Sequence, residues 1–312
     1  MIEIDGLAKS FGRVQAVREL TFSARPGEIV GMLGPNGAGK TTTLRMITGF
    51  LRPCRGRVSV CGYHVERFPQ AAQRQMGYLP EGAPAYGDMT TVQFLNFVAE
   101  IRGLYGAAKR NRFFAMVDAL ELGPVLDRRI DELSKGYKRR VGLAQALIHD
   151  PRVLILDEPT DGLDPNQKQL VRDLIRRIAP DKIILVSTHV LEEVSAMCNR
   201  AIIIAAGRLV ADGSPGQLAG RCRYDGAVTV AIEGAGDIAA SLRALPAVLE
   251  VETDAERPDC FTLLVEQGRN LVPDVSALVH RRGWRLQALQ VHSGHLDEVF
   301  RELTRTPAEV VH

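Results

Sequence analysis

A glycine-rich segment between an apolar run and a helical pattern constrains this chain more than any other feature of its sequence. Residues 34–42 read GPNGAGKTT and match the pattern G-x-x-x-x-G-K-[ST]. The apolar run at 29–33 predicts a buried strand, and apolar residues at 44–47 predict a helix. This order of elements predicts an α/β fold with a phosphate-binding loop, and an incidental glycine turn is the disfavoured alternative.

The composition of the loop suits a nucleotide. Glycine lets the chain bend so tightly that several backbone N–H groups point at one anion, and a helix N-terminus adds its positive dipole. We expect Lys40 to reach the β- and γ-phosphates and the Thr41 hydroxyl to ligate Mg²⁺. The residues expected to bind nucleotide here are Gly34, Pro35, Asn36, Gly37, Ala38, Gly39, Lys40, Thr41 and Thr42.

A second apolar run ends in two acids. Residues 153–156 read VLIL and predict a strand that is buried on both faces of a parallel sheet. Asp157 and Glu158 follow it directly. Beside a phosphate loop, we expect Asp157 to hold Mg²⁺ and Glu158 to act as general base on the attacking water. A solvated acidic turn is the alternative.

The motifs of this chain occur in an order that resembles one family. The segments GPNGAGKTT at 34–42, LSKGYKRR at 133–140, VLILDEPTDGLDP at 153–165 and STH at 187–189 together resemble the ATP-binding cassette (ABC) ATPases. The resemblance covers about residues 1–215, and the segment at 133–140 discriminates best because other phosphate-loop proteins lack it. It implies a P-loop NTPase fold that binds and hydrolyses ATP with Mg²⁺.

Residues 133–137 occupy the place of the family's signature, LSGGQ, which binds the γ-phosphate of ATP held by the opposite subunit. Ser134 and Gly136 match it, whereas Lys135 replaces a glycine and Tyr137 a glutamine. A helix that starts near Gly136 would let the matching pair bind the anion. Lys135 either contacts that phosphate or lies solvated at the surface. The departure resembles a variant found in exporter-type cassettes.

The resemblance assigns three further site residues. Glu81 stands where most cassettes have a glutamine that contacts Mg²⁺ and the membrane partner, and it adds a third acid near Asp157 and Glu158. His189 fits the position that donates a hydrogen bond to the γ-phosphate, with a structural histidine as the alternative. Phe11 fits the aromatic residue that stacks on adenine, with a place in the core as the alternative.

The resemblance also implies a dimer. Asp161, Gly162, Leu163 and Asp164 fit the loop that crosses between the two subunits, with Asp164 as its usual acid. If the signature completes the site of another chain, one copy cannot form a whole site. We therefore expect a head-to-tail homodimer around two ATP molecules, joined to ABC membrane-spanning permease subunits.

Charge and cysteine content exclude some other functions. A net charge of +2 argues against a nucleic-acid partner, and we interpret the basic clusters at 52–57, 135–140 and 172–177 as solvated faces. The five cysteines are odd in number and lack C-x-x-C spacing, which is typical of reduced thiols. Without a signal segment or an apolar stretch of about 20 residues, we expect a cytoplasmic protein, peripheral on the inner face of the cell membrane.

The sequence predicts two domains and a linker. We expect residues 1–215 to form the ATP-binding domain, with a helical subdomain at about 82–150, residues 216–225 to be a linker, and 226–312 to form an accessory or regulatory α+β domain. Its pattern predicts the ferredoxin-like order βαββαβ. The strands are expected at 228–232, 248–251, 260–265 and 284–291, the helices at 237–245 and 272–281, and a last helix at 296–303.

Three functions fit these observations. The favoured one is the ATPase subunit of an exporter, because the signature variant, Glu81 and the C-terminal domain resemble that branch of the family. A cassette ATPase acting on ribosomes or DNA usually carries two cassettes or a coiled-coil insertion. A regulatory module that hydrolyses ATP poorly often lacks the base expected at Glu158. The transported substrate is not indicated by any residue of this chain.

Overall fold

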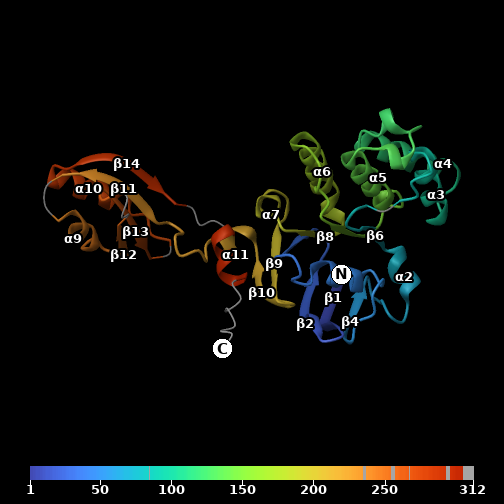
Figure 1. The fold of residues 1–312 in the computed structure, drawn as a ribbon, viewed down its shortest axis with the longest axis horizontal. Helices are drawn as coiled ribbons and strands as arrows, with labels where there is room; N and C mark the ends of the chain where they lie inside the picture. Colours follow the sequence, from blue (N-terminus) through green and yellow to red (C-terminus); the bar gives the residue numbers. More distant parts are fainter. Residues whose placement is uncertain (84, 235–236, 254–256, 267, 293–295, 305–312) are drawn as a thin grey trace. The chain divides into compact units, whose positions relative to one another are not determined.

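The computed structural model describes residues 1–304 except 84, 235–236, 254–256, 267 and 293–295. The chain divides into two compact units, with Met1–Ser214 in the first and Pro215–Glu302 in the second (Figure 1). The described strands of the first unit form two sheets, and those of the second unit form one sheet.

A six-stranded sheet runs through the first unit. Its strands, in spatial order, are β10 (Arg208–Gly213), β9 (Arg200–Ala205), β3 (Ile29–Leu33), β8 (Ile183–Thr188), β7 (Val153–Asp157) and β6 (Met76–Leu79). All neighbours are parallel except β10, which runs antiparallel to β9 at one edge. Every residue of β3, β7 and β8 is buried, as expected of strands covered on both faces. Their carboxyl ends share one edge of the sheet, so the segments that follow them meet there.

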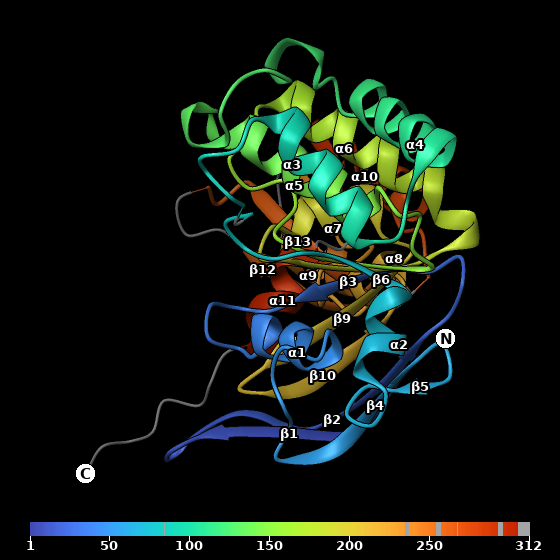
Figure 2. The ribbon, with the colours of Figure 1, turned by 90° about the vertical axis from the view of Figure 1, so that its right-hand side faces the viewer.

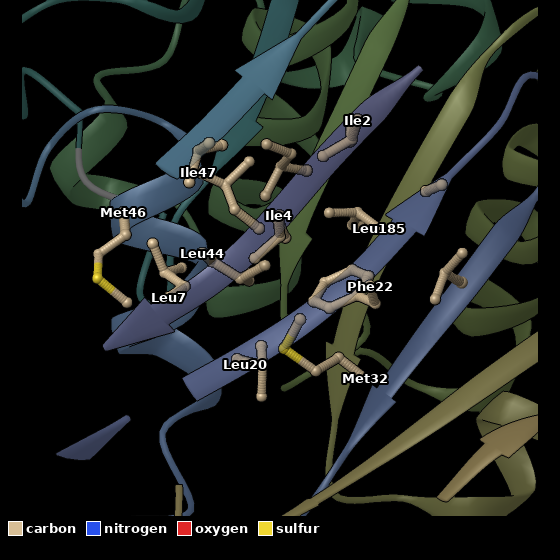
Figure 3. Close-up of a cluster of buried hydrophobic side chains, with 14 of the residues drawn as sticks. Ile2, Ile4, Leu7, Leu20, Phe22, Met32, Leu44, Met46, Ile47 and Leu185 are labelled. Carbon is tan, nitrogen blue, oxygen red and sulfur yellow. The ribbon is translucent and has the colours of Figure 1, made fainter. Parts of the chain in front are cut away.

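An antiparallel sheet packs near the first one. It consists of β1 (Ile2–Phe11), β2 (Val14–Ala24), β4 (Arg55–Val60) and β5 (Tyr63–His64). Figure 3 shows its apolar side chains facing helix α1 (Lys40–Ile47) and the central sheet. The labelled members of this core are Ile2, Ile4, Leu7, Leu20, Phe22, Met32, Leu44, Met46, Ile47 and Leu185. This core fixes α1, and with it the loop that precedes the helix.

A helical region follows β6 in the chain and lies apart from the antiparallel sheet (Figure 2). It contains α3 (Thr91–Ile101), α4 (Gly106–Ala119), η1 (Gly123–Val125), η2 (Ile130–Glu132) and α5 (Lys135–Leu147). Apolar residues of α4 such as Phe113 and Met116 are buried in the core. The apolar residues of α3 are divided between core and surface, because Leu95 is fully buried and Ile101 is 66% exposed.

The remaining helices of the first unit are shorter or line the central sheet. They are α2 (Pro69–Arg74), α6 (Pro165–Ile178), η3 (Ala179–Asp181) and α7 (Leu191–Met197). Across the described part of both units, no helix combines the length and apolar character needed to cross a membrane.

The second unit has one antiparallel sheet with two helices between its strands. In chain order it contains β11 (Val228–Glu233), α9 (Ile238–Arg243), β12 (Val248–Thr253), β13 (Cys260–Val265), α10 (Val272–Arg282) and β14 (Arg285–Val291). The spatial order is β12-β13-β11-β14, and the chain order is the βαββαβ arrangement that the sequence predicts. Helix α11 (Leu296–Thr304) follows.

The segment expected to be a linker contains regular structure. Helix α8 (Pro215–Ala219) overlaps the expected span of 216–225. Leu218 is fully buried there, and Cys222 is 7% exposed. The first part of the expected linker is therefore a short helix with a buried leucine and not an irregular connector.

Candidate functional site

The phosphate loop connects β3 to α1 and is held by close backbone contacts. Gly39 has a φ of 104°, and a Cβ at this position would lie 2.5 Å from the carbonyl oxygen of Ala16. A Cβ on Gly34 would collide with the carbonyl oxygen of Ile204. Side chains are therefore excluded at both ends of the loop, which leaves its backbone free to approach a ligand closely.

Lys40, the first residue of α1, is folded back over the loop. Its Nζ donates to the carbonyl oxygen of Gly34 at 2.6 Å and of Pro35 at 3.2 Å. The residue is only 7% exposed, and burial lowers the pKa of Lys40, while the charges of Glu158, Asp157 and Glu81 act in the opposite direction. The site thus combines a desolvated lysine with the negative charges of nearby acids. This combination suits a ligand that is an anion bound together with a metal cation.

Asp157 ends β7 directly beside the phosphate loop and is 1% exposed. Its Oδ1 accepts a short hydrogen bond from the Ser187 hydroxyl and a longer one, 3.4 Å, from the Thr41 hydroxyl. Its Oδ2 is buried and has no hydrogen-bond partner among the described residues. A buried carboxylate oxygen without a partner is costly, and a hard cation is the usual compensation.

Glu158 adopts a left-handed conformation, with a φ of 52°, immediately after that strand. Its backbone N–H donates to the Ser187 carbonyl oxygen at 3.1 Å, which anchors this turn to β8. Its Oε1 lies 2.9 Å from the Nδ1 atom of His189. Burial raises the pKa of Glu158 above its ordinary value, and the hydrogen bond and charge of His189 and the charge of Lys40 counteract this. A carboxylate with a raised pKa is a better general base than an ordinary one.

One cavity of about 440 Å³ is lined both by the phosphate loop and by other residues that the sequence assigns to the nucleotide site. Its lining residues are Phe11, Ala16, Asn36, Gly37, Gly39, Lys40, Thr41, Thr42, Glu81 and Glu158. Phe11 is 50% exposed, so the alternative that Phe11 is a core residue is wrong. Asp157, Glu158 and Glu81 do not form a three-carboxylate metal cluster in the described part of the chain, although Glu81 shares the cavity with Glu158.

The segment in the place of the signature forms the start of α5. Ser134 is the N-cap, and its Oγ accepts a hydrogen bond from the Tyr137 N–H at 3.4 Å. Gly136 packs against α6, since a Cβ there would lie 2.5 Å from the Oε1 atom of Gln167. The helix begins at Lys135, one residue before the expected start.

Lys135 has a partner that neither sequence interpretation included. Its Nζ lies 2.8 Å from the Oδ2 atom of Asp161 in the same chain, and its side chain is 66% exposed. This ion pair joins the start of α5 to the segment after Glu158, where Gly162 has a φ of 75°. The exposure agrees with a surface lysine, and a contact of Lys135 with the phosphate held by a second chain stays a prediction.

The basic run at 135–140 is only in part a solvated face, in contrast to the expectation. Arg139 and Arg140 are each 3% exposed. Arg140 donates to the carbonyl oxygen of Leu120 at 2.9 Å, and its guanidinium lies 4.3 Å from the centroid of the Tyr137 ring. Arg140 thus connects α5 to the end of α4, whereas Arg139 donates to the carbonyl oxygen of Pro80 at 3.2 Å; buried guanidinium groups require such acceptors.

The loop expected to cross between subunits leads into α6. Asp164 caps this helix, and its Oδ1 accepts from the Gln167 N–H at 2.9 Å. Leu163 is 7% exposed, whereas Asp161 and Gly162 are exposed. Asp164 thus has a structural task within its own chain.

Two polar groups near the site were not identified from the sequence. Ser187 donates to Asp157, and Glu193 is a buried carboxylate that accepts a hydrogen bond from Thr188, the residue before His189. Ser187 directly precedes the Thr-His pair and could have been noticed there. Glu193 looks like an ordinary acid in the first turn of a helix, and its burial is visible only in the folded chain.

The fold and this site define a phosphate-loop ATPase, and comparison with known proteins narrows the class. Residues 17–161 match the family model described as ABC transporter. The Nod factor export ATP-binding protein I of Paraburkholderia xenovorans (strain LB400) is 37% identical over 263 residues, which are 84% of this chain and 86% of that protein. A probable multidrug ABC transporter ATP-binding protein of Escherichia coli (strain K12) is 34% identical over 72% of this chain and 39% of its own length.

Solved structures agree with these relatives. An ATP-binding subunit of an ABC transporter is 30% identical, with a TM-score of 0.66 over 70% of this chain and 91% of that one. The fold is also that of a dimeric ATP-binding cassette in a post-hydrolysis state with ADP and Pi, at 21% identity and a TM-score of 0.62 over 69% of this chain and 99% of that one. The chain belongs to the ABC transporter family, as an ATP-binding subunit with ATPase activity.

Proposed function

We propose that this chain drives export, as the ATP-hydrolysing subunit of a transporter whose membrane-spanning subunits are separate chains. The observation that carries the proposal is the cavity that Lys40 and Glu158 share at the carboxyl ends of β3 and β7. The names of the relatives, a Nod factor export protein and a probable multidrug transporter protein, support the direction of transport. We propose a location on the inner face of the cell membrane, reached through the membrane subunits.

Each part of the cavity is assigned one task. The loop amides and Lys40 bind the phosphates of ATP, and Phe11 stacks on the adenine from the exposed rim. Glu158 accepts a proton from the attacking water, and His189 donates a hydrogen bond to the γ-phosphate. The 2.9 Å contact between Glu158 and His189 supports this assignment, because it brings both side chains to one point.

Mg²⁺ fits the residues present. The orphaned, buried Oδ2 of Asp157 and the Thr41 hydroxyl are oxygen ligands of the kind this ion prefers, and Glu81 lies on the same cavity. Bound there, Mg²⁺ would neutralise charge on the phosphates. Asp157 itself would keep one oxygen for the Ser187 and Thr41 hydroxyls and present the other to the ion.

The signature segment is proposed to act on the ATP of a second copy of this chain. Ser134 and the N–H groups at the start of α5 form an anion-binding helix end of a 13-residue helix. The loop containing Asp161 and Asp164 connects that end to α6 and to Glu158. ATP would close the head-to-tail dimer, and hydrolysis would reopen it.

The membrane subunits are proposed to contact the groove between the helical region and the first core. A cavity of about 880 Å³ lies there, lined by residues from three segments, 48–50, 70–78 and 101–103, together with His149. Phe50 and Ile101 on this groove are 72% and 66% exposed. Two large apolar side chains on an open groove support a protein partner at this place.

Glu158→Gln tests the function. The variant should bind ATP as the unchanged chain does, because the loop and Lys40 are intact, but turn over ATP at least about 10²-fold more slowly because the base is gone. It should also accumulate as an ATP-bound dimer in size-exclusion chromatography. Glu132→Gln, at an exposed acid outside the cavity, is the matched control. Unchanged turnover in Glu158→Gln removes Glu158 as the base and the proposal with it.

A further inference from the structure

One buried carboxylate is hydrogen-bonded to the segments that carry the residues proposed to act on ATP. Glu193, in α7, is 1% exposed. Its Oε2 accepts a short hydrogen bond from the Thr160 hydroxyl and a second one, 3.2 Å, from the Thr188 hydroxyl. Its Oε1 accepts from the Lys168 Nζ at 3.1 Å. The carboxylate therefore joins three other segments of the chain to α7.

The two threonines belong to the segments that carry the proposed reacting groups. Thr160 is two residues after Glu158, and Thr188 is the last residue of β8, directly before His189. They are 2% and 0% exposed, so water does not compete for their hydroxyl groups. Glu158 and His189, which belong to the same two segments, are 2.9 Å apart, measured from Oε1 to Nδ1.

Both threonines make further contacts with the backbone, Thr188 through its hydroxyl and Thr160 through its carbonyl oxygen. The Thr188 hydroxyl also accepts the Val190 N–H at 3.0 Å, which fixes the turn in which His189 lies. The Thr160 carbonyl oxygen accepts the Leu163 N–H at 3.2 Å, which fixes the turn after Glu158. A shift of the carboxylate would therefore move both turns.

The third partner supplies charge and a connection to α6. Lys168 is half-buried, with 31% of its side chain exposed, and among the described residues it is the only cation that forms an ion pair with Glu193. A buried carboxylate without such a partner would be strongly destabilising. Lys168 lies one turn after Asp164, so α6 links the loop 161–164 to the same carboxylate.

We propose that Glu193 is a positioning residue for ATP hydrolysis, whose carboxylate holds the Glu158 turn and the His189 turn together so that both side chains face one point. The proposal rests on the function proposed above, since it requires Glu158 and His189 to act on ATP. Glu193 does not line the nucleotide cavity described above, and it acts only through the two threonines.

Glu193→Gln is the first test, with Glu192→Gln as the matched control on an exposed residue of the same helix. The amide has nearly the shape of the acid but donates where the hydroxyl groups also need to donate. We expect kcat to fall about 10- to 100-fold, the size of effect that a misplaced catalytic group produces, with the Kd for ATP unchanged. Glu192→Gln should retain the turnover of the unchanged chain.

Thr188→Val and Thr188→Ser form the second test and do not alter the buried charge. Valine has the shape of threonine without its hydroxyl, whereas serine keeps the hydroxyl. We expect the valine variant to lose turnover and the serine variant to recover most of it, with both variants measured at a temperature where they are fully folded, because valine removes two buried hydrogen bonds. Equal losses in both variants would assign Thr188 a packing role only and overturn the proposal.

A double-mutant cycle with His189→Ala separates positioning from a general loss of structure. If Glu193 acts through His189 and Glu158, the combined loss of kcat is well below the product of the two single losses. Independent, multiplying losses contradict the proposal. If Glu158→Gln abolishes turnover while Glu193→Gln leaves it unchanged, only the positioning role fails. If Glu158→Gln leaves turnover unchanged, the proposed function itself fails.

Discussion

The nucleotide cavity and the signature segment differ in how completely one chain builds them. In the cavity, Lys40 and Asp157 are 7% and 1% exposed, and acids, hydroxyls and loop carbonyls surround them. In the signature, Ser134 is exposed and Lys135 is 66% exposed. Of the described residues, none from 134–137 lines the cavity of the same chain. We propose that the first region is one preorganised half of a site and that the second is a surface for another copy.

The largest effect is expected from a substitution in the nucleotide cavity, the buried half of the proposed site. Lys40→Ala removes the one lysine that lines the described cavity and should weaken ATP binding at least about 10²-fold, because a desolvated charge–phosphate contact is lost. Binding of a fluorescent ATP analogue measures this. Lys109→Ala, in the helical region, serves as the control. Retained affinity in Lys40→Ala would mean that the loop amides alone bind the phosphates.

The next largest effect is expected from a substitution in the signature segment, the exposed half of the proposed site, that leaves helix α5 intact. Ser134→Asp retains a good N-cap for α5 but places a negative charge where the γ-phosphate of a second chain's ATP should lie. ATP binding to the single chain should be unchanged, and turnover should fall at least about 10²-fold. Equilibrium binding and steady-state phosphate release distinguish these results. If turnover persists, the signature does not act on the phosphate.

The pH dependence sharpens the account of the buried half. Glu158 works as a base only when ionised, and burial raises its pKa, so kcat/KM should fall on acidification at a pH above that of an ordinary glutamate. The hydrogen bond from His189 lowers the pKa of Glu158. His189→Ala should therefore move the acidic limb to higher pH, whatever its effect on the maximum rate. An unshifted limb would show that the two residues are not coupled.

The smallest expected effect concerns the ion pair that holds the exposed half. Lys135 and Asp161 are 2.8 Å apart, but their side chains are 66% and 45% exposed to solvent. Breaking the pair by Lys135→Gln should change the free energy of unfolding by less than about 1 kcal/mol. Urea denaturation of Lys135→Gln, Asp161→Asn and the double variant measures the coupling. A coupling well above this value would mean that the pair determines the loop conformation.

The buried half was largely predictable from the sequence, because its determinants are local. A glycine loop between an apolar run and a helix, and acids directly after a strand, fix their own surroundings within a few residues. The parallel sheet then brings the ends of β3, β7 and β8 together, so Lys40, Asp157 and Glu158 could be assigned to one place.

The contacts that depend on distant segments could not be predicted. Lys135 pairs with Asp161, 26 residues further along the chain, and Arg140 reaches carbonyl groups at the end of α4. Glu193 and the neighbouring Glu192 are the same residue type, but Glu192 is exposed and Glu193 is buried because of its position on α7. The sequence shows which residues are charged, but tertiary packing decides which of these charges are removed from water.

Mixing two inactive variants tests the central claim, that each chain holds half of a site, most directly. In a dimer of Lys40→Ala with Ser134→Asp, the intact phosphate loop of one chain faces the intact signature of the other. We predict that each variant alone is inactive and that an equal mixture regains roughly a quarter of the ATPase rate, since half of the dimers then contain one complete site. No recovery from variants that fold and associate would contradict the account.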